Sequence, residues 1–245
     1  MGLSYSYLVF MERAKFLDAL QTVAAFAEDT GPDARTAVAL CGRAITLPFA
    51  YSGSAALPDL DPVSYEAPIA LDTPRHTHGF RTSLFFEEAD EAVASYVEGW
   101  TRGVRSEWKR DPTNAAFQDW LPPRDDRGRA AIGYIYLTVW TDLSYDEDLE
   151  ARDDYGPDLV LLQFTAATSD MSRLFEESAA VRRAFVSHAA GCGAVCGLLD
   201  RRNSDPGDAV VFWLDGREHQ GTVVSRAWLP LDEIRRQVAA AAPDV

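Results

Sequence analysis

Lysine is almost absent from this sequence: only Lys15 and Lys109 occur, and arginine supplies the rest of the positive charge. Asparagine is limited to Asn114 and Asn203 while alanine is abundant, a bias that GC-rich coding in a bacterium would produce. The chain carries 38 acidic and 23 basic residues, a net charge of -15. Such a field repels nucleic-acid phosphates and anionic lipid headgroups, so we expect neither as a partner. A basic protein partner would be attracted, although we favour the interpretation that the acidic charge keeps the protein soluble.

Cysteine is also scarce, and no apolar run is long. The three cysteines, Cys41, Cys192 and Cys196, are too few and odd in number for a disulfide framework, which favours a reducing compartment. In an extended strand Cys192 and Cys196 would lie roughly 13 Å apart, too far for a disulfide, so we expect buried free thiols. No stretch approaches the ~20 apolar residues of a membrane helix, and the first residues lack a basic leader. The sequence therefore predicts a cytoplasmic protein.

Recognisable catalytic and cofactor motifs are missing. The sequence contains no P-loop, no GxGxxG, no GxSxG and no HExxH. His76 and His78 could share one face of an extended segment and bind a metal, but no third ligand is evident, and we favour solvated histidines in a surface loop. The acidic stretch 142–158 lacks the spacing of a calcium loop. We therefore expect no metal and no cofactor, and lean against an enzyme, although a triad of distant residues stays open.

Hydrophobic periodicity predicts alternating strands and helices. Strands are expected at 4–10, 36–41, 44–49, 80–86, 131–141, 158–165, 194–199, 209–214 and 222–229. Helices are expected at 11–28, 87–105, 168–190 and 231–241. The link Gly42-Arg43 predicts a hairpin between the second and third strands. The proline-rich stretch 50–79 is expected to be a long loop with little regular structure.

The order of these elements suggests an internal duplication. Residues 4–105 and 158–241 both follow the order β-α-β-β-β-α. We predict an α+β fold of two related halves, each a small, mixed but mostly antiparallel sheet with helices on one face, close to a ferredoxin-like arrangement. The expected divisions are an N-terminal half 1–141, an acidic linker 142–157 and a C-terminal half 158–245. Strand 131–141 is the segment that would join the halves into one compact body.

The same strand 131–141 carries the most suggestive pattern. Aliphatic side chains at positions 135, 137 and 139 alternate with an aromatic set, Tyr134, Tyr136 and Trp140. Alternate side chains point to opposite faces of a sheet, so the aliphatic set suits the core. The aromatic set predicts a cleft wall or a partner surface, unless a second layer buries both faces.

Two function hypotheses follow, and a structural or regulatory domain without a ligand is a third. The first is a non-enzymatic binding protein with a basic protein partner, for example an immunity or inhibitor protein against a basic toxin. The second is a small-molecule sensor or enzyme with a cleft between the halves. There the loop 50–79 would be a lid and His76 or His78 a polar group, and the cleft would be lined by these histidines and by Tyr134 or Tyr136.

Overall fold

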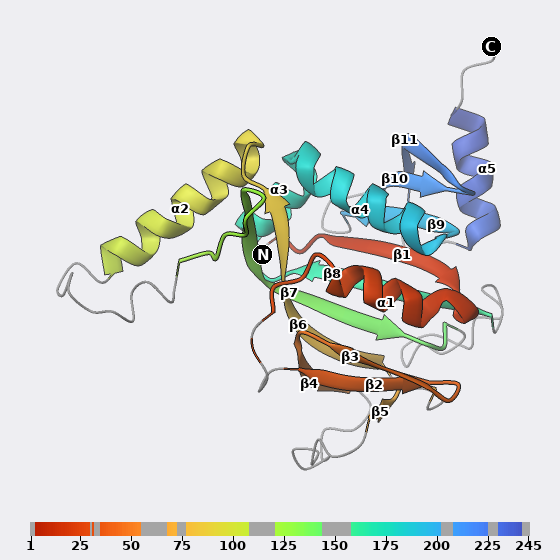
Figure 1. Ribbon diagram of the computed structural model, residues 1–245. Helices are drawn as coiled ribbons and strands as arrows, with labels where there is room; N and C mark the ends of the chain where they lie inside the picture. The colour runs from red at the N-terminus through yellow and green to blue at the C-terminus, as the bar shows by residue number, and fades with distance from the viewer. Residues whose placement is uncertain are drawn as a thin grey trace.

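A computed structural model describes residues 3–29, 31, 35–54, 68–72, 77–107, 121–143, 158–201, 208–224 and 230–241. Eight strands form one sheet in the order β11-β10-β9-β1-β8-β7-β6-β4, and three strands form a smaller sheet in the order β3-β2-β5 (Figure 1). All neighbours in the large sheet are antiparallel. The predicted class, α+β with antiparallel sheets, is therefore confirmed.

The large sheet contains β1 (Ser6–Glu12), β4 (Ala50–Ser54), β6 (Thr77–Glu87), β7 (Arg129–Trp140), β8 (Leu159–Ala166), β9 (Cys196–Asp200), β10 (Asp208–Leu214) and β11 (Arg217–Val224). The smaller sheet contains β2 (Thr36–Leu40), β3 (Arg43–Leu47) and β5 (Ile69–Ala70). The helices are α1 (Phe16–Ala24), α2 (Glu91–Glu107), α3 (Ser169–Glu177), α4 (Ala179–Cys192) and α5 (Leu231–Ala241), and a short 3-10 helix, η1 (Arg13–Lys15), precedes α1. None of the helices in the described segments is both long and apolar enough to cross a membrane.

A small ferredoxin-like sheet in each half, as predicted, is not confirmed. Strand β1 of the N-terminal half pairs with β8 and with β9, which both belong to the C-terminal half. Strand β1 thus lies between two strands of the C-terminal half within one sheet. The reason lies in β1 itself, because a strand that is apolar at consecutive positions needs cover on both faces and so takes a central place.

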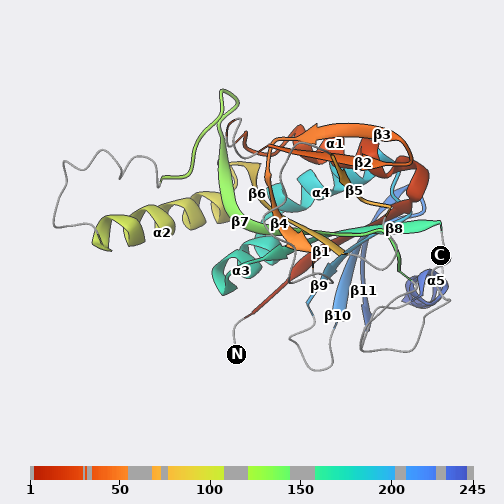
Figure 2. The same cartoon turned by 90° about the horizontal axis from the view of Figure 1, so that it is seen from below.

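The helices cover both faces of this sheet, and the prediction that they lie on one face is wrong. Tyr7 and Val9 of β1 belong to the core that contains Phe185 of α4, whereas Leu8 and Phe10 belong to a second core with Ile234 of α5. Figure 2 shows α1 and α4 on one side of the sheet and α5 on the other. In the first core the Tyr7 ring stacks on Phe185 at a centroid distance of 3.9 Å.

Several predicted boundaries also change. The stretch 50–79 contains β4, β5 and the first residues of β6, so it is not a single irregular loop. Its segments 55–67 and 73–76, like the expected acidic linker 142–157, lie outside the described residues. The first helix begins at Phe16 because β1 continues to Glu12, where the Arg13 amide donates to the Asp158 carbonyl at 2.7 Å.

Two tight connections differ from their predictions in detail. The β2–β3 hairpin turns at Cys41 and Gly42, with φ of 50° and 78°, one residue earlier than expected. Positive φ at both central positions matches the turn that suits the twist of a two-residue hairpin. The predicted helix 168–190 is divided at Ser178, whose extended backbone ends α3 and whose hydroxyl caps α4 by accepting from the Val181 amide at 3.1 Å.

Candidate functional site

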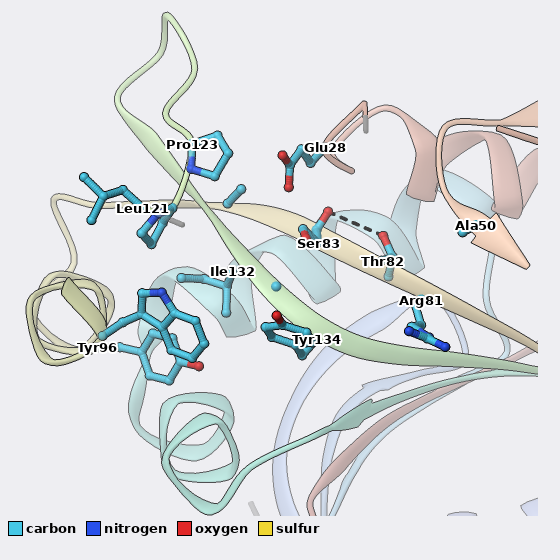
Figure 3. A pocket seen from close by; sticks show the side chains of 14 residues that line it. Glu28, Ala50, Arg81, Thr82, Ser83, Tyr96, Leu121, Pro123, Ile132 and Tyr134 are labelled. Carbon is cyan, nitrogen blue, oxygen red and sulfur yellow. Dashed lines mark hydrogen bonds between the residues drawn. The ribbon is translucent and has the colours of Figure 1, made fainter. Parts of the chain in front are cut away.

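A cavity of about 500 Å³ lies between α2 and the adjoining strands β6 and β7 (Figure 3). Three groups of residues form it: the two strands, the face of α2 and the segment 121–123. Glu28 and Ala50 complete the lining at the outer edge of β6. Because ligand sites in proteins usually measure about 300–1,000 Å³, this volume suits a small organic molecule.

A β-bulge in β7 creates the space. Thr82 pairs with Ile135 and Leu84 with Ile132, so Gly133 and Tyr134 together oppose Ser83 alone. Ile132 and Ile135 both point into the core, which leaves the two residues between them outside it. Bulges re-aim side chains in this way and are common beside binding sites.

Small side chains line the cavity along the strands. Gly133 is closely opposed to Ser83: a Cβ atom built on this glycine would lie 3.2 Å from Ser83 Oγ. Ala131 lies two residues before Gly133 and also lines the cavity. Larger residues at these places would fill the space that the bulge opens.

Aromatic rings form the wall opposite the strands. Tyr96 and Trp100 are four residues apart in α2 and so share one face of the helix. The rings of Trp100 and Tyr134 lie 6.0 Å apart, centroid to centroid. Tyr134 has a positive φ of 63°, a conformation that costs a non-glycine residue energy, and such strain often accompanies functional sites. Burial raises the pKa of Tyr96, so its phenol is neutral at physiological pH.

Two opposite charges flank the cavity. Glu28 is held beside β6 because its amide donates to the Ser83 carbonyl at 2.8 Å, and Arg81 precedes Ser83 by two residues on β6. In Figure 3 Glu28 and Arg81 lie on either side of Ser83. Within the described part of the chain, neither the Glu28 carboxylate nor the Arg81 guanidinium forms an ion pair.

The aromatic residues predicted from the strand pattern are distributed differently. Tyr134 lines the cavity and is 53% exposed. Tyr136 is 44% exposed and is the cross-strand partner of Arg81, but it does not line the cavity. Trp140 is half-buried, and its indole N–H donates to Gln163 Oε1 at 3.0 Å. These residues share one face of β7, and Tyr134 alone of the three meets the cavity.

Of the two predicted histidines, His78 does not line this cavity. His76 lies outside the described residues. His78 is buried on the core side of β6, where its Nδ1 lies 3.3 Å from the Tyr51 hydroxyl oxygen. The expectation that His78 is solvated in a surface loop is therefore wrong, because β6 begins at Thr77 and its alternation turns residue 78 inward.

The described residues also include possible metal ligands and two buried cysteine thiols. In the described segments no three His, Cys, Asp or Glu residues are arranged to hold a metal ion. Burial raises the pKa of the Cys192 thiol to about 11 and that of Cys196 to about 12. Both are thus unreactive thiols rather than nucleophiles.

Sequence reasoning missed most of the cavity. Its lining residues Glu28, Arg81 and Trp100 come from segments far apart in the chain, and each resembles an ordinary surface residue in the sequence. Two local signals were present: the aromatic alternation that gave Tyr134, and Gly133, because a glycine inside a strand often marks a bulge. Comparison with protein-family models, with curated proteins and with solved structures found no match for this chain.

Proposed function

We propose that this chain is a small-molecule-binding protein and that its ligand occupies the cavity between α2 and the bulge of β7. The observation that carries the proposal is the composition of the lining. Rings and aliphatic side chains dominate it, and the polar groups are few: Glu28, Arg81, Thr82, Ser83 and the two tyrosine hydroxyls. A mainly apolar concavity with a few polar groups is the usual form of a ligand site.

A cavity-filling substitution tests this function. Ser83→Leu places a branched side chain in the cavity, whereas Thr138→Leu introduces the same side chain on β7, outside the lining. Both wild-type residues are half-buried strand residues, so the two variants are matched in structure. Thermal unfolding is followed for all three proteins against a panel of aromatic and aliphatic acids, amines and amino acids.

A ligand that binds the native state raises the unfolding midpoint through mass action. We expect wild type and Thr138→Leu to respond to the same compounds and Ser83→Leu to lose that response. A flat panel for wild type, or an equal response in Ser83→Leu, would refute the cavity as the ligand site.

A second candidate function is binding of a basic protein. It is supported by the net charge of -15 and by a groove of about 540 Å³ between α2 and α3. Glu91, Asp170 and Glu177 line this groove, and its one arginine, Arg173, is paired with Asp170 at 2.7 Å. Charge of one sign steers an oppositely charged partner mainly through the association rate.

Charge reversal tests this second candidate. The double substitution Glu91→Lys with Glu177→Lys should weaken binding of an oligolysine peptide at low salt. The same reversal at Glu12 and Glu218, which do not line the groove, should have a smaller effect. Equal losses in the two double variants would indicate a diffuse electrostatic attraction and no docking site in the groove.

A further inference from the structure

We propose that the ligand of this cavity is a zwitterion with an aromatic body, the chemistry of a free aromatic amino acid, with Arg81 binding its carboxylate and Glu28 its ammonium group. This inference rests on the proposed function and specifies its ligand class. It follows from three features of the cavity: the placement of two charges, the field of the whole chain and the nature of the walls.

The main chain of β6 around Ser83 positions both charged residues. The Glu28 amide donates to the Ser83 carbonyl at 2.8 Å, and the bridge between Ala27 and Leu84 holds the same segment against β6. Arg81 lies two residues from Ser83, about 7 Å along an extended strand. A glutamate and an arginine side chain that start this close can both reach one small ligand.

Other charged residues near the end of β6 and the start of β7 form ion pairs. Arg124 pairs with Glu88 at 2.6 Å, and Arg129 pairs with Asp125 at 2.6 Å. Arg81 and Glu28 line one cavity and, in the described portion of the chain, pair neither with each other nor with another residue. A guanidinium offers paired donors that match a carboxylate, and a carboxylate accepts from an ammonium group.

The negative electrostatic field of the whole chain weighs against an anionic ligand. A net charge of -15 repels anions from the surface, and a compound with one carboxylate or phosphate and no cation would be repelled on approach. A zwitterion avoids this repulsion and still presents a carboxylate to Arg81. The same field weighs against nucleotides and other polyanions.

The walls suit an aromatic body. The centroids of the Trp100 and Tyr134 rings are 6.0 Å apart and their planes are tilted by 42°, and both residues line the cavity together with Ser83 and Gly133. Aromatic pairs gain energy beyond the burial of their area when they stack or meet edge to face. The ligand body would lie against these rings, with its charged end toward Arg81 and Glu28.

Four compounds that share an indole ring test the proposal by calorimetric titration. Indole is neutral, indole-3-propionate is an anion, tryptamine is a cation, and tryptophan is the zwitterion. We expect tryptophan to bind about tenfold more tightly than either singly charged compound, because charge-assisted hydrogen bonds would form at both ends. Arg81→Ala should abolish the advantage of tryptophan over tryptamine, and Glu28→Gln its advantage over indole-3-propionate.

Matched controls are Arg217→Ala, an exposed strand arginine on β11, and Glu177→Gln on α3, both outside the cavity. The controls should leave the order of affinities unchanged. If indole-3-propionate or indole binds at the cavity as tightly as tryptophan, or if Glu28→Gln changes nothing, the zwitterion is refuted and the proposed function stands. If none of the four compounds binds wild type, the aromatic zwitterion is refuted, and the thermal-unfolding panel decides whether the proposed function stands.

Discussion

The indole ring of Trp100 and the phenol ring of Tyr134 lie 6.0 Å apart at an interplanar angle of 42°. This contact joins α2 to the bulge of β7 and defines one wall of the cavity. It depends on the left-handed backbone of Tyr134, whose φ is 63°, because the bulge turns Gly133 and Tyr134 away from the core together.

Tyr134→Gly should lower the affinity for tryptophan with little change in stability. Glycine adopts a positive φ without the steric cost of roughly 1–2 kcal/mol that other residues bear, and this gain offsets the lost contact with Trp100. We expect the free energy of unfolding in urea to change by less than about 1 kcal/mol, while the calorimetric affinity for tryptophan falls.

The control for this substitution is Tyr136→Gly, at an exposed position two residues further along β7 with an ordinary backbone. Here glycine relieves no strain and weakens a strand, so this variant should lose more stability than Tyr134→Gly and keep its affinity for tryptophan. The reverse order of stabilities would contradict the strain assigned to Tyr134.

Gly197→Ala should destabilise the large sheet. A Cβ atom at Gly197 of β9 would lie 2.4 Å from Cζ of the buried Phe212 ring, closer than any real contact. Relief requires Phe212 to leave a packed core, which typically costs about 1–3 kcal/mol. In urea unfolding, Gly221→Ala on β11, where a Cβ atom meets nothing within 4 Å, should cost much less. Equal losses of stability in the two variants would mean that the Phe212 ring moves aside at little energetic cost.

Asp90→Ala should destabilise two helices at once. Asp90 Oδ1 accepts from the Val93 amide of α2 at 3.2 Å, and Oδ2 accepts from the Ala180 amide of α4 at 3.0 Å. The Ser178 hydroxyl also donates to Oδ1 at 2.9 Å. Because one carboxylate caps two N-termini, we expect a loss of about 2 kcal/mol in the free energy of unfolding.

The matched control is Asp170→Ala in the first turn of α3, where the exposed carboxylate pairs with Arg173 and a loss below about 1 kcal/mol is expected. Burial tends to raise the pKa of Asp90, but the hydrogen bonds from Ser178, Ala180, Val93 and Ala92 outweigh it and lower the pKa below 3.8. The stabilisation is therefore present above that pH and is lost as the pH falls through the folded-state pKa. A similar loss in both variants at neutral pH would contradict the double cap.

His188 should make stability depend on pH in mildly acidic solution. Its Nδ1 lies 2.8 Å from Thr22 Oγ1, and the Thr22 hydroxyl donates to the Ala19 carbonyl, so we infer that Nδ1 carries the proton of a neutral ring. Burial lowers the pKa of His188 from 6.5 to about 4. Between these values the unfolded chain binds the proton and the folded chain does not, so the free energy of unfolding falls by roughly 3 kcal/mol as the pH drops.

His188→Asn keeps a donor toward Thr22 and cannot titrate. Urea unfolding from pH 7 to pH 4 should therefore show a shallower decline for this variant than for wild type, despite lower stability at pH 7. His219→Asn, at a half-exposed position, should follow the wild-type decline. An unchanged slope in His188→Asn would mean that another group accounts for the acid sensitivity.

The sequence predicted the positions of individual helices and strands better than the order in which the strands pair. The strand around 131–141 and the helix 231–241 follow from periodicity and a proline at the helix start, and the structure places β7 and α5 there. The sheet order did not follow, since pairing of β1 with β8 and β9 depends on contacts more than 140 residues apart in sequence. The continuous burial of Tyr7 to Met11 was the physical sign that β1 is central.

Sequence reasoning could have located part of the cavity from the interrupted alternation at Gly133. Strict alternation through Gly133 would place Ile132 on the same face as Tyr134, whereas the bulge moves Ile132 into the core. A glycine between two isoleucine-containing segments hinted at this irregularity. The meeting of Trp100, Glu28 and Arg81 had no sequence signal, because it depends on how α2 and the segment after α1 pack against β6 and β7.

The most direct test of the account is a two-dimensional amide NMR titration with tryptophan. We predict that the largest shift changes occur at Ser83, Gly133 and Tyr134 and at the indole N–H of Trp100, and that Ser83→Leu abolishes them. Saturable changes centred instead on β9 to β11 and α5 would contradict the cavity as the ligand site, and no change at any residue at millimolar tryptophan would contradict the aromatic zwitterion as its ligand.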